Sequence, residues 1–154
     1  MRGDQSCILP LATPCKFWTE VVCVKPDLTG EWGLNRQASS LTGGASAMES
    51  GVIWIEHRDP QCKFRINMSA GDQSVERAWE SMADGKEVAG GGVVTRLFWD
   101  EDTLVFDAHS QNPDKAWTMS WRYELLDAGK RLRAVEEIRG GGHDQNNTWI
   151  FERR

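Results

Sequence analysis

Residues 27–35 read DLTGEWGLN, and this stretch decides how the rest of the chain is interpreted. Before it, prolines and cysteines interrupt the chain, whereas after it short segments of alternating apolar and polar residues are separated by turn residues. Alternation with a period of two is typical of strands that bury one face. We therefore expect residues 28–34 to form the first strand of a single all-β domain covering residues 27–154.

Composition limits the classes of function. The chain has 154 residues, a length typical of one domain with a core or an enclosed cavity. Its formal net charge of −5 argues against nucleic-acid binding, which depends on a basic surface. No apolar run approaches the roughly 20 residues of a membrane span. Eight tryptophans accompany a single tyrosine, which indicates either an aromatic core or an aromatic-lined cavity.

The cysteines do not form a metal-binding pattern. Cys7, Cys15, Cys23 and Cys62 are too widely spaced for a CxxC pair, and none has a histidine at ligand spacing. We expect no metal and no cofactor. A disulfide between the N-terminal segment and Cys62 fits the sequence, but reduced thiols in a cytoplasmic protein are the default expectation. We expect a monomer or a homodimer.

Residues 1–26 differ in character from the rest of the chain. An arginine and a short apolar stretch resemble a signal peptide, but Asp4, Pro10 and Pro14 interrupt that pattern. We expect an N-terminal arm, in which residues 17–24 (FWTEVVCV) could add one strand to the edge of the sheet.

After this arm, strand and turn signals repeat at the spacing of a β-sandwich or β-barrel. The expected strands cover residues 28–34, 52–58, 62–69, 74–82, 93–99, 103–110, 116–125, 132–139 and 147–153. Their short connections imply a meander, and a long meander usually closes on itself to remove its edges. The sequence therefore predicts an up-and-down antiparallel β-barrel of about eight to ten strands. No helical pattern alternates with the strands, which excludes a parallel α/β sheet.

Two short motifs resemble a known group of barrels. Gly30 and Trp32 form a GxW pair in the first expected strand, and the last strand ends in NTWIFERR. With the meander, they resemble the calycin superfamily, which includes lipocalins and fatty-acid-binding proteins, although the TDY-like loop of lipocalins is missing. The resemblance implies that Trp32 closes one end of the barrel against a late arginine, Arg153 or Arg154. We take Arg153 as the partner, in a cation–π contact worth about 0.5–2 kcal/mol. Calycins bind small hydrophobic molecules inside the barrel, and a few isomerise or cyclise them.

Strand parity indicates which side chains face the interior. The apolar rows are clearest on residues 62–69 and 116–125, and polar residues such as Arg77 and Glu136 fall into other inward rows. In a binding protein, Arg77 or Tyr123 would anchor a carboxylate or a carbonyl, because a guanidinium pairs bidentately with carboxylate. The side chains expected to contact the ligand are Trp54, Arg77, Trp79, Trp117, Trp121 and Tyr123.

An enzymatic alternative uses the same cavity. His109 with Asp107, or Glu136, would act as general acid or base on a lipophilic substrate. Asp107 and His109 share a face with Val105, but the opposite row of Leu104, Phe106 and Ala108 is more apolar, so exposure of both remains open. Glu136 and Arg77 could likewise pair inside the barrel or be exposed.

The sequence thus predicts, first, a binding protein for a small hydrophobic or amphipathic molecule. The alternative is a cofactor-independent isomerase or cyclase. A structural barrel filled by its tryptophans, without a cavity, is the third option.

Overall fold

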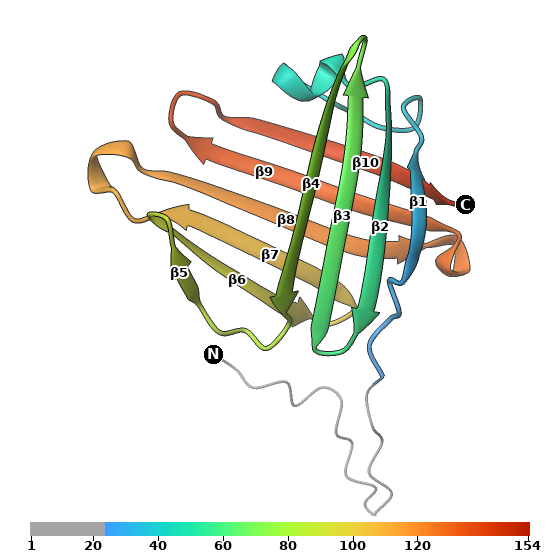
Figure 1. The fold of residues 1–154 in the computed structure, drawn as a ribbon, viewed down its shortest axis with the longest axis horizontal. Coiled ribbons are helices and arrows are strands. Elements are labelled where there is room, and N and C mark those ends of the chain that lie inside the picture. Colours follow the sequence, from blue (N-terminus) through green and yellow to red (C-terminus); the bar gives the residue numbers. More distant parts are fainter. Residues whose placement is uncertain (1–23) are drawn as a thin grey trace, which may run out of the picture.

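The computed structural model describes residues 24–154, which form one sheet of ten antiparallel strands (Figure 1). The strands are β1 (Gly30–Leu34), β2 (Ser50–Arg58), β3 (Gln61–Ala70), β4 (Gln73–Met82), β5 (Val88–Gly90), β6 (Val93–Asp100), β7 (Thr103–Ser110), β8 (Trp117–Leu126), β9 (Arg131–Gly140) and β10 (Gln145–Arg153). Three short 3-10 turns complete the fold: η1 (Gly43–Ala47), η2 (Pro113–Lys115) and η3 (Asp127–Gly129). Within the described residues, no helix is long and apolar enough to cross a membrane. The strand considered for residues 17–24 lies almost wholly outside this region.

The strands follow one another around the sheet in the order β4-β3-β2-β1-β10-β9-β8-β7-β6-β5. This order confirms the predicted all-antiparallel up-and-down arrangement, with the first and last described strands side by side. The sheet curls so that β2, β3 and β4 cross in front of β7, β8 and β9 (Figure 1). It is a half-barrel, because β4 and β5 are its two edges and no ladder among the described strands joins them. The expected closure is therefore incomplete, and the short β5 was not expected from the sequence.

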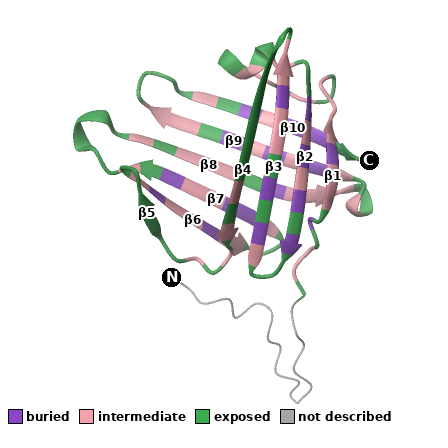
Figure 2. Cartoon of the chain, in the orientation of Figure 1, coloured by how far each residue is buried: buried purple, intermediate pink, exposed green. Residues whose placement is uncertain are grey.

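The segment after β4 contacts β6 at one end of the sheet, where the Gly85 amide donates a hydrogen bond to the Leu97 carbonyl at 2.9 Å. The Ala83 amide donates to the Pro60 carbonyl at 2.7 Å and so extends the pairing of β4 with β3 by one bond. Most of β4 is exposed, whereas β2, β3 and the strands behind them alternate buried and accessible residues (Figure 2). The core therefore lies between the two layers, away from the free edge of β4.

Along each strand, every second side chain points into the space between the two layers, as the sequence pattern requires; these side chains form the inward row of the strand. Phe64 on β3 lies opposite Ile55 on β2 and Trp79 on β4, and all three belong to the inward row. On the other layer, Leu132 lies opposite Phe151 and Leu125. Since a shift of one residue would turn each row to the solvent, burial of these side chains fixes the register of the ladders.

Trp32 and Arg153 pack against each other where β1 and β10 pair. The Trp32 side chain is fully buried, and its indole Nε1 donates a hydrogen bond to the Leu28 carbonyl at 3.0 Å. Arg153, which lies directly opposite on β10, places its guanidinium carbon 4.2 Å from the centre of the Trp32 ring. The same guanidinium donates to the Thr29 carbonyl at 2.8 Å. A Cβ atom at Gly30 would lie 2.6 Å from Arg153 Nη1, so the glycine is what allows this close approach.

Candidate ligand-binding cavity

A cavity of about 590 Å³ lies between the two layers of the sheet. Its volume falls within the range of roughly 300–1,000 Å³ that is typical of small-molecule sites. The tryptophans therefore do not fill the interior completely, contrary to the option of a solid structural barrel. Six aromatic side chains from both layers line it: Trp79, Phe106, Trp121, Tyr123, Trp149 and Phe151. Methionines at positions 48, 68 and 119 add flexible apolar surface.

The aromatic wall on β8 and β10 is a continuous cluster. The rings of Trp121 and Tyr123 lie nearly parallel with centres 6.0 Å apart, and the Trp149 ring lies 6.1 Å from that of Trp121. On the intervening strand β9, Ala134 is opposite both Tyr123 and Trp149. Its small side chain leaves space in which the larger rings on the two neighbouring strands can approach each other. On the facing layer, Trp79 stacks on Phe64 with ring centres 5.0 Å apart.

A buried carboxylate adjoins this wall. Glu136 on β9 is 8% exposed, and it lies opposite Trp121 on one side and Asn147 on the other. Its Oε2 accepts hydrogen bonds from Asn147 Nδ2 at 2.7 Å and from Trp149 Nε1 at 3.3 Å. Asn147 is held in turn by the amide of Thr42, which donates to its Oδ1 at 2.6 Å. Glu136 is thus internal, as parity allowed, but neutral donors hold it in place of an arginine.

Tyr123 brings a polar group into the cavity itself. Its side chain is buried, and its hydroxyl makes no hydrogen bond with a described residue. Burial, and secondarily the charge of Glu136, raise the pKa of the Tyr123 hydroxyl far above its usual range. The hydroxyl therefore stays protonated at neutral pH and is free to donate or to accept a hydrogen bond.

Arg77 lines the cavity from the edge strand β4. It belongs to the row of Val75 and Trp79, as parity predicted, and lies opposite Ile66. Arg77 is exposed to solvent, and its Nη1 donates a hydrogen bond to the Glu76 carbonyl at 3.2 Å. Among the described residues it has no ion-pair partner, so its guanidinium remains available at the open edge of the cavity.

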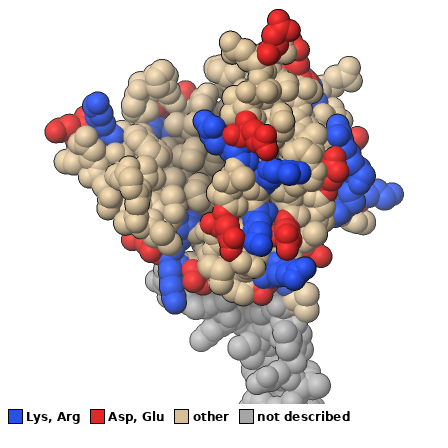
Figure 3. Space-filling view, in the orientation of Figure 1, with Lys and Arg blue, Asp and Glu red and all other residues tan. Residues whose placement is uncertain are grey.

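Other residues expected at the site lie elsewhere. Trp54 is on the outer face of β2, where the Arg65 guanidinium carbon is 4.2 Å from its ring centre. Charged side chains of both signs lie on the face formed by β2, β3 and β4 (Figure 3). Trp117 is in the inward row but at the beginning of β8, opposite Gly140, and does not line the cavity.

The catalytic pair expected at Asp107 and His109 also faces away from the cavity. Asp107 pairs with Arg96 at 3.1 Å on the outer face of the sheet, and His109 is exposed. The physical reason is the register of β7, which places Phe106 opposite Leu97 and Trp121 in the inward row. Parity also could have identified Phe106 and Trp149 as cavity residues, since both occupy the more apolar row of their strands.

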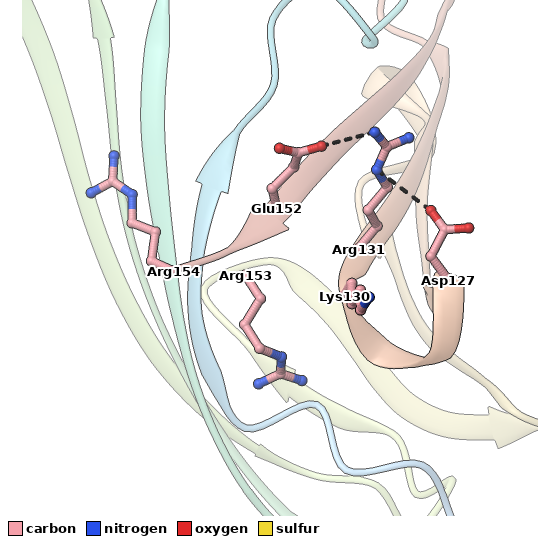
Figure 4. Close-up of a pocket in the computed structure, with 6 residues that line it drawn as sticks. All are labelled: Asp127, Lys130, Arg131, Glu152, Arg153 and Arg154. Atoms are coloured by element: carbon pink, nitrogen blue, oxygen red, sulfur yellow. Dashed lines mark ion pairs between the residues drawn. The ribbon is translucent and has the colours of Figure 1, made fainter.

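A second hollow lies between the end of β10 and the turn that precedes β9 (Figure 4). It is open, has a volume of about 760 Å³, and is lined only by charged side chains: Asp127, Lys130, Arg131, Glu152, Arg153 and Arg154. Arg131 forms ion pairs with Glu152 at 2.9 Å and with Asp127 at 3.5 Å. These internal pairs satisfy much of its charge, so the apolar cavity is the better candidate for a binding site.

Neither a family model nor a curated protein matches this chain. Solved structures do match. A variant of the fluorescent protein UnaG has a TM-score of 0.58 and 14% identity, over 82% of this chain and 95% of that one. Human cRBP IV has a TM-score of 0.57 and 16% identity, over 84% and 99%. The REP1-NXSQ fatty acid transporter has a TM-score of 0.55 and 14% identity, over 83% and 96%. At such identities these likenesses establish a shared fold.

Proposed function

We propose that this chain, whose fold is that of fatty-acid-binding-protein-like calycins, binds a small hydrophobic or amphipathic molecule between the layers of its sheet. The observation that carries the proposal is the apolar cavity of about 590 Å³ with aromatic side chains on both walls. Enclosed apolar surface with a few polar groups is the usual character of a small-molecule site. The similar fold of a protein described as a fatty acid transporter supports the same class of ligand.

Within this proposal, Trp79 and Trp121 contact the apolar part of the ligand from opposite layers. Arg77 binds a carboxylate or a carbonyl of the ligand near the free edge of β4. The support for this role is that Arg77 lines the cavity and forms no ion pair with a described residue. Trp54 and Trp117 are not part of the proposed site.

The alternative of an isomerase or cyclase depends on Glu136 alone. It is the one predicted acid or base that lies beside the cavity, since Asp107 and His109 face the opposite side of the sheet. General acid–base catalysis needs a group within hydrogen-bond reach of the reacting atom. We therefore rank binding first.

Titration with the fluorescent arylamine 1-aminoanthracene tests the proposal. We expect saturable binding, seen as enhanced probe emission and quenched tryptophan emission. Trp121→Ala should weaken it about threefold to tenfold, since aromatic pairs contribute about 0.5–1.5 kcal/mol beyond area burial. Trp54→Ala is the matched control on the outer face and should leave the affinity unchanged. Absence of saturable binding in the folded wild-type protein, or equal losses in both variants, would refute the proposed site.

A further inference from the structure

The polar groups of the interior are unevenly satisfied. Glu136 Oε2 accepts two hydrogen bonds, but Oε1 accepts none from a described residue. Among the described residues, Arg133 Nε is the one solvent-inaccessible side-chain polar atom without a partner. Oε1 is therefore unpaired but accessible to water. Glu136 is only 8% exposed and lies in the inward row of β9. It is not itself a lining residue of the cavity, but Trp121, which lies opposite it, and Trp149, which is hydrogen-bonded to it, both line the cavity.

No described cation compensates this carboxylate. The arginines nearest to it, one on β8 and two on β9 itself, point to the outer face, where each has its own acidic partner. Arg122 pairs with Asp100, Arg133 with Glu124, and Arg139 with Glu137. A carboxylate oxygen is an acceptor, and leaving it unpaired in a low-dielectric interior is unfavourable. A ligand group that donates a hydrogen bond to Glu136 Oε1 would therefore be favoured at the interior end of the cavity.

Tyr123 stands on the same wall. Tyr123 lies opposite Ala134, two residues before Glu136 in the inward row of β9, so the two polar residues are diagonal neighbours on adjacent strands; in agreement, the charge of Glu136 contributes to the raised pKa of the Tyr123 hydroxyl. The hydroxyl has no partner among the described residues and lines the cavity. One acceptor and one hydroxyl thus lie behind an apolar space, with the Arg77 cation at the free edge of the sheet.

We propose that the interior end of the cavity selects a ligand group that donates a hydrogen bond, either a protonated amine or a hydroxyl, to Glu136, with Tyr123 as the second polar contact. This inference rests on the proposed binding function and adds its chemical class. A carboxylate at this end would meet the negative charge of Glu136, so an acidic group of a ligand belongs at the Arg77 edge. The polarity of the site therefore orients an amphipathic molecule.

Three probes with the same alkyl chain test the inference at pH 7: dodecylamine, dodecyltrimethylammonium and dodecanoic acid, each below its micelle concentration. The first two carry the same charge, but only dodecylamine has N–H donors. Displacement of 1-aminoanthracene gives their affinities. Wild-type protein should bind dodecylamine about tenfold or more tightly than the trimethylated probe, the factor expected for a hydrogen bond to a charged group.

Glu136→Gln should abolish that preference and leave the affinity for dodecanoic acid equal or increased. Glu137→Gln removes the same charge from the outer face of the same strand, where the side chain pairs with Arg139 at 3.1 Å, and should keep the preference. An unchanged preference in Glu136→Gln, or equal effects of the two substitutions, would overturn the inference. If Glu136→Gln does not fold, the comparison of the two cations on wild-type protein decides, and equal affinities overturn it. Failure of all three probes and of 1-aminoanthracene would instead refute the proposed function.

Discussion

Replacing Trp32 by alanine separates the contribution of its contact with Arg153 to stability from the contribution of the cavity to binding. The Trp32 ring is fully buried under the Arg153 guanidinium and is hydrogen-bonded to the Leu28 carbonyl. It is absent from the cavity lining. Its removal should therefore destabilise the fold while leaving the ligand contacts in place.

The expected loss in the free energy of unfolding follows from the cost of truncating a buried tryptophan, of which two specific contacts are a part. Truncation of a buried tryptophan to alanine costs about 3–5 kcal/mol through lost transfer energy and the cavity left behind. That sum includes the cation–π contact of Arg153, worth about 0.5–2 kcal/mol when desolvated, and the hydrogen bond to Leu28, worth about 0.5–1.5 kcal/mol. For a chain of this size, 1 kcal/mol corresponds to roughly 2–4 °C, so Tm should fall by about 6–20 °C.

Urea denaturation of wild type and Trp32→Ala, with affinity for 1-aminoanthracene measured in the folded baseline, provides the assay. Trp32→Phe keeps an apolar ring but lacks the indole N–H, so it should recover most of the lost stability. We expect the denaturation midpoint to fall and the dissociation constant to change less than about threefold, which corresponds to under 0.7 kcal/mol. A folded Trp32→Ala protein that no longer binds the probe would refute our placement of the site, and an unchanged midpoint would refute the stabilising role of Trp32.

Three further predictions address the cavity edge, the core and the outer face. Arg77→Gln should weaken dodecanoic acid by about twofold to fivefold, as expected for an exposed ion pair, and leave dodecylamine unaffected in the same displacement assay. Burial, and secondarily the charge of Asp59, raise the pKa of the Cys62 thiol to about 12 from its usual 9.0. The unfolded chain therefore loses this proton at a lower pH than the folded protein does. The free energy of unfolding should consequently fall as the pH rises from 9 to 12. Chemical denaturation across this window should show a shallower decline in Cys62→Ala than in wild type, and identical slopes would contradict the assignment. His109→Ala should alter neither 1-aminoanthracene affinity nor any activity found later, since its side chain is exposed on the outer face; a loss of either would return it to the site.

The fold was predictable because period-two alternation is the physical signature of a half-buried strand. The segment from Cys62 to Ser69 alternates without exception and lies within β3, and the segment from Trp117 to Leu125 lies within β8. β5 has only three residues and is followed at once by Gly91, so no alternation could develop. The absence of pairing between the edge strands β4 and β5 was not predictable either, because it depends on the curl of the whole sheet.

The lining of the cavity was predictable where parity was unambiguous. Trp79, Trp121 and Tyr123 belong to inward rows, and the structure brings them to one cavity. Trp54 alternates with Ile53 and Ile55, which are buried, so its own strand already placed it outside. On β7 both rows contain apolar residues, but the row of Phe106 is the more apolar one, and its pairing with Leu97 on β6 and Trp121 on β8 places that row inward.

The hydrogen bonds of Glu136 show why sequence reasoning could not define the interior. Glu136 and Asn147 are brought together by the register of β9 and β10, and Asn147 is fixed from outside the sheet by Thr42, in the loop before β2. This line of contacts holds the carboxylate next to the aromatic residues that line the cavity, so the polar specificity that we propose depends on a loop that carries no recognisable motif. Trp32, by contrast, is fixed where β1 and β10 pair. The proposed stabilising contact and the proposed ligand-selecting carboxylate therefore lie in different parts of the same sheet, which is why substitutions at the two positions should separate stability from binding.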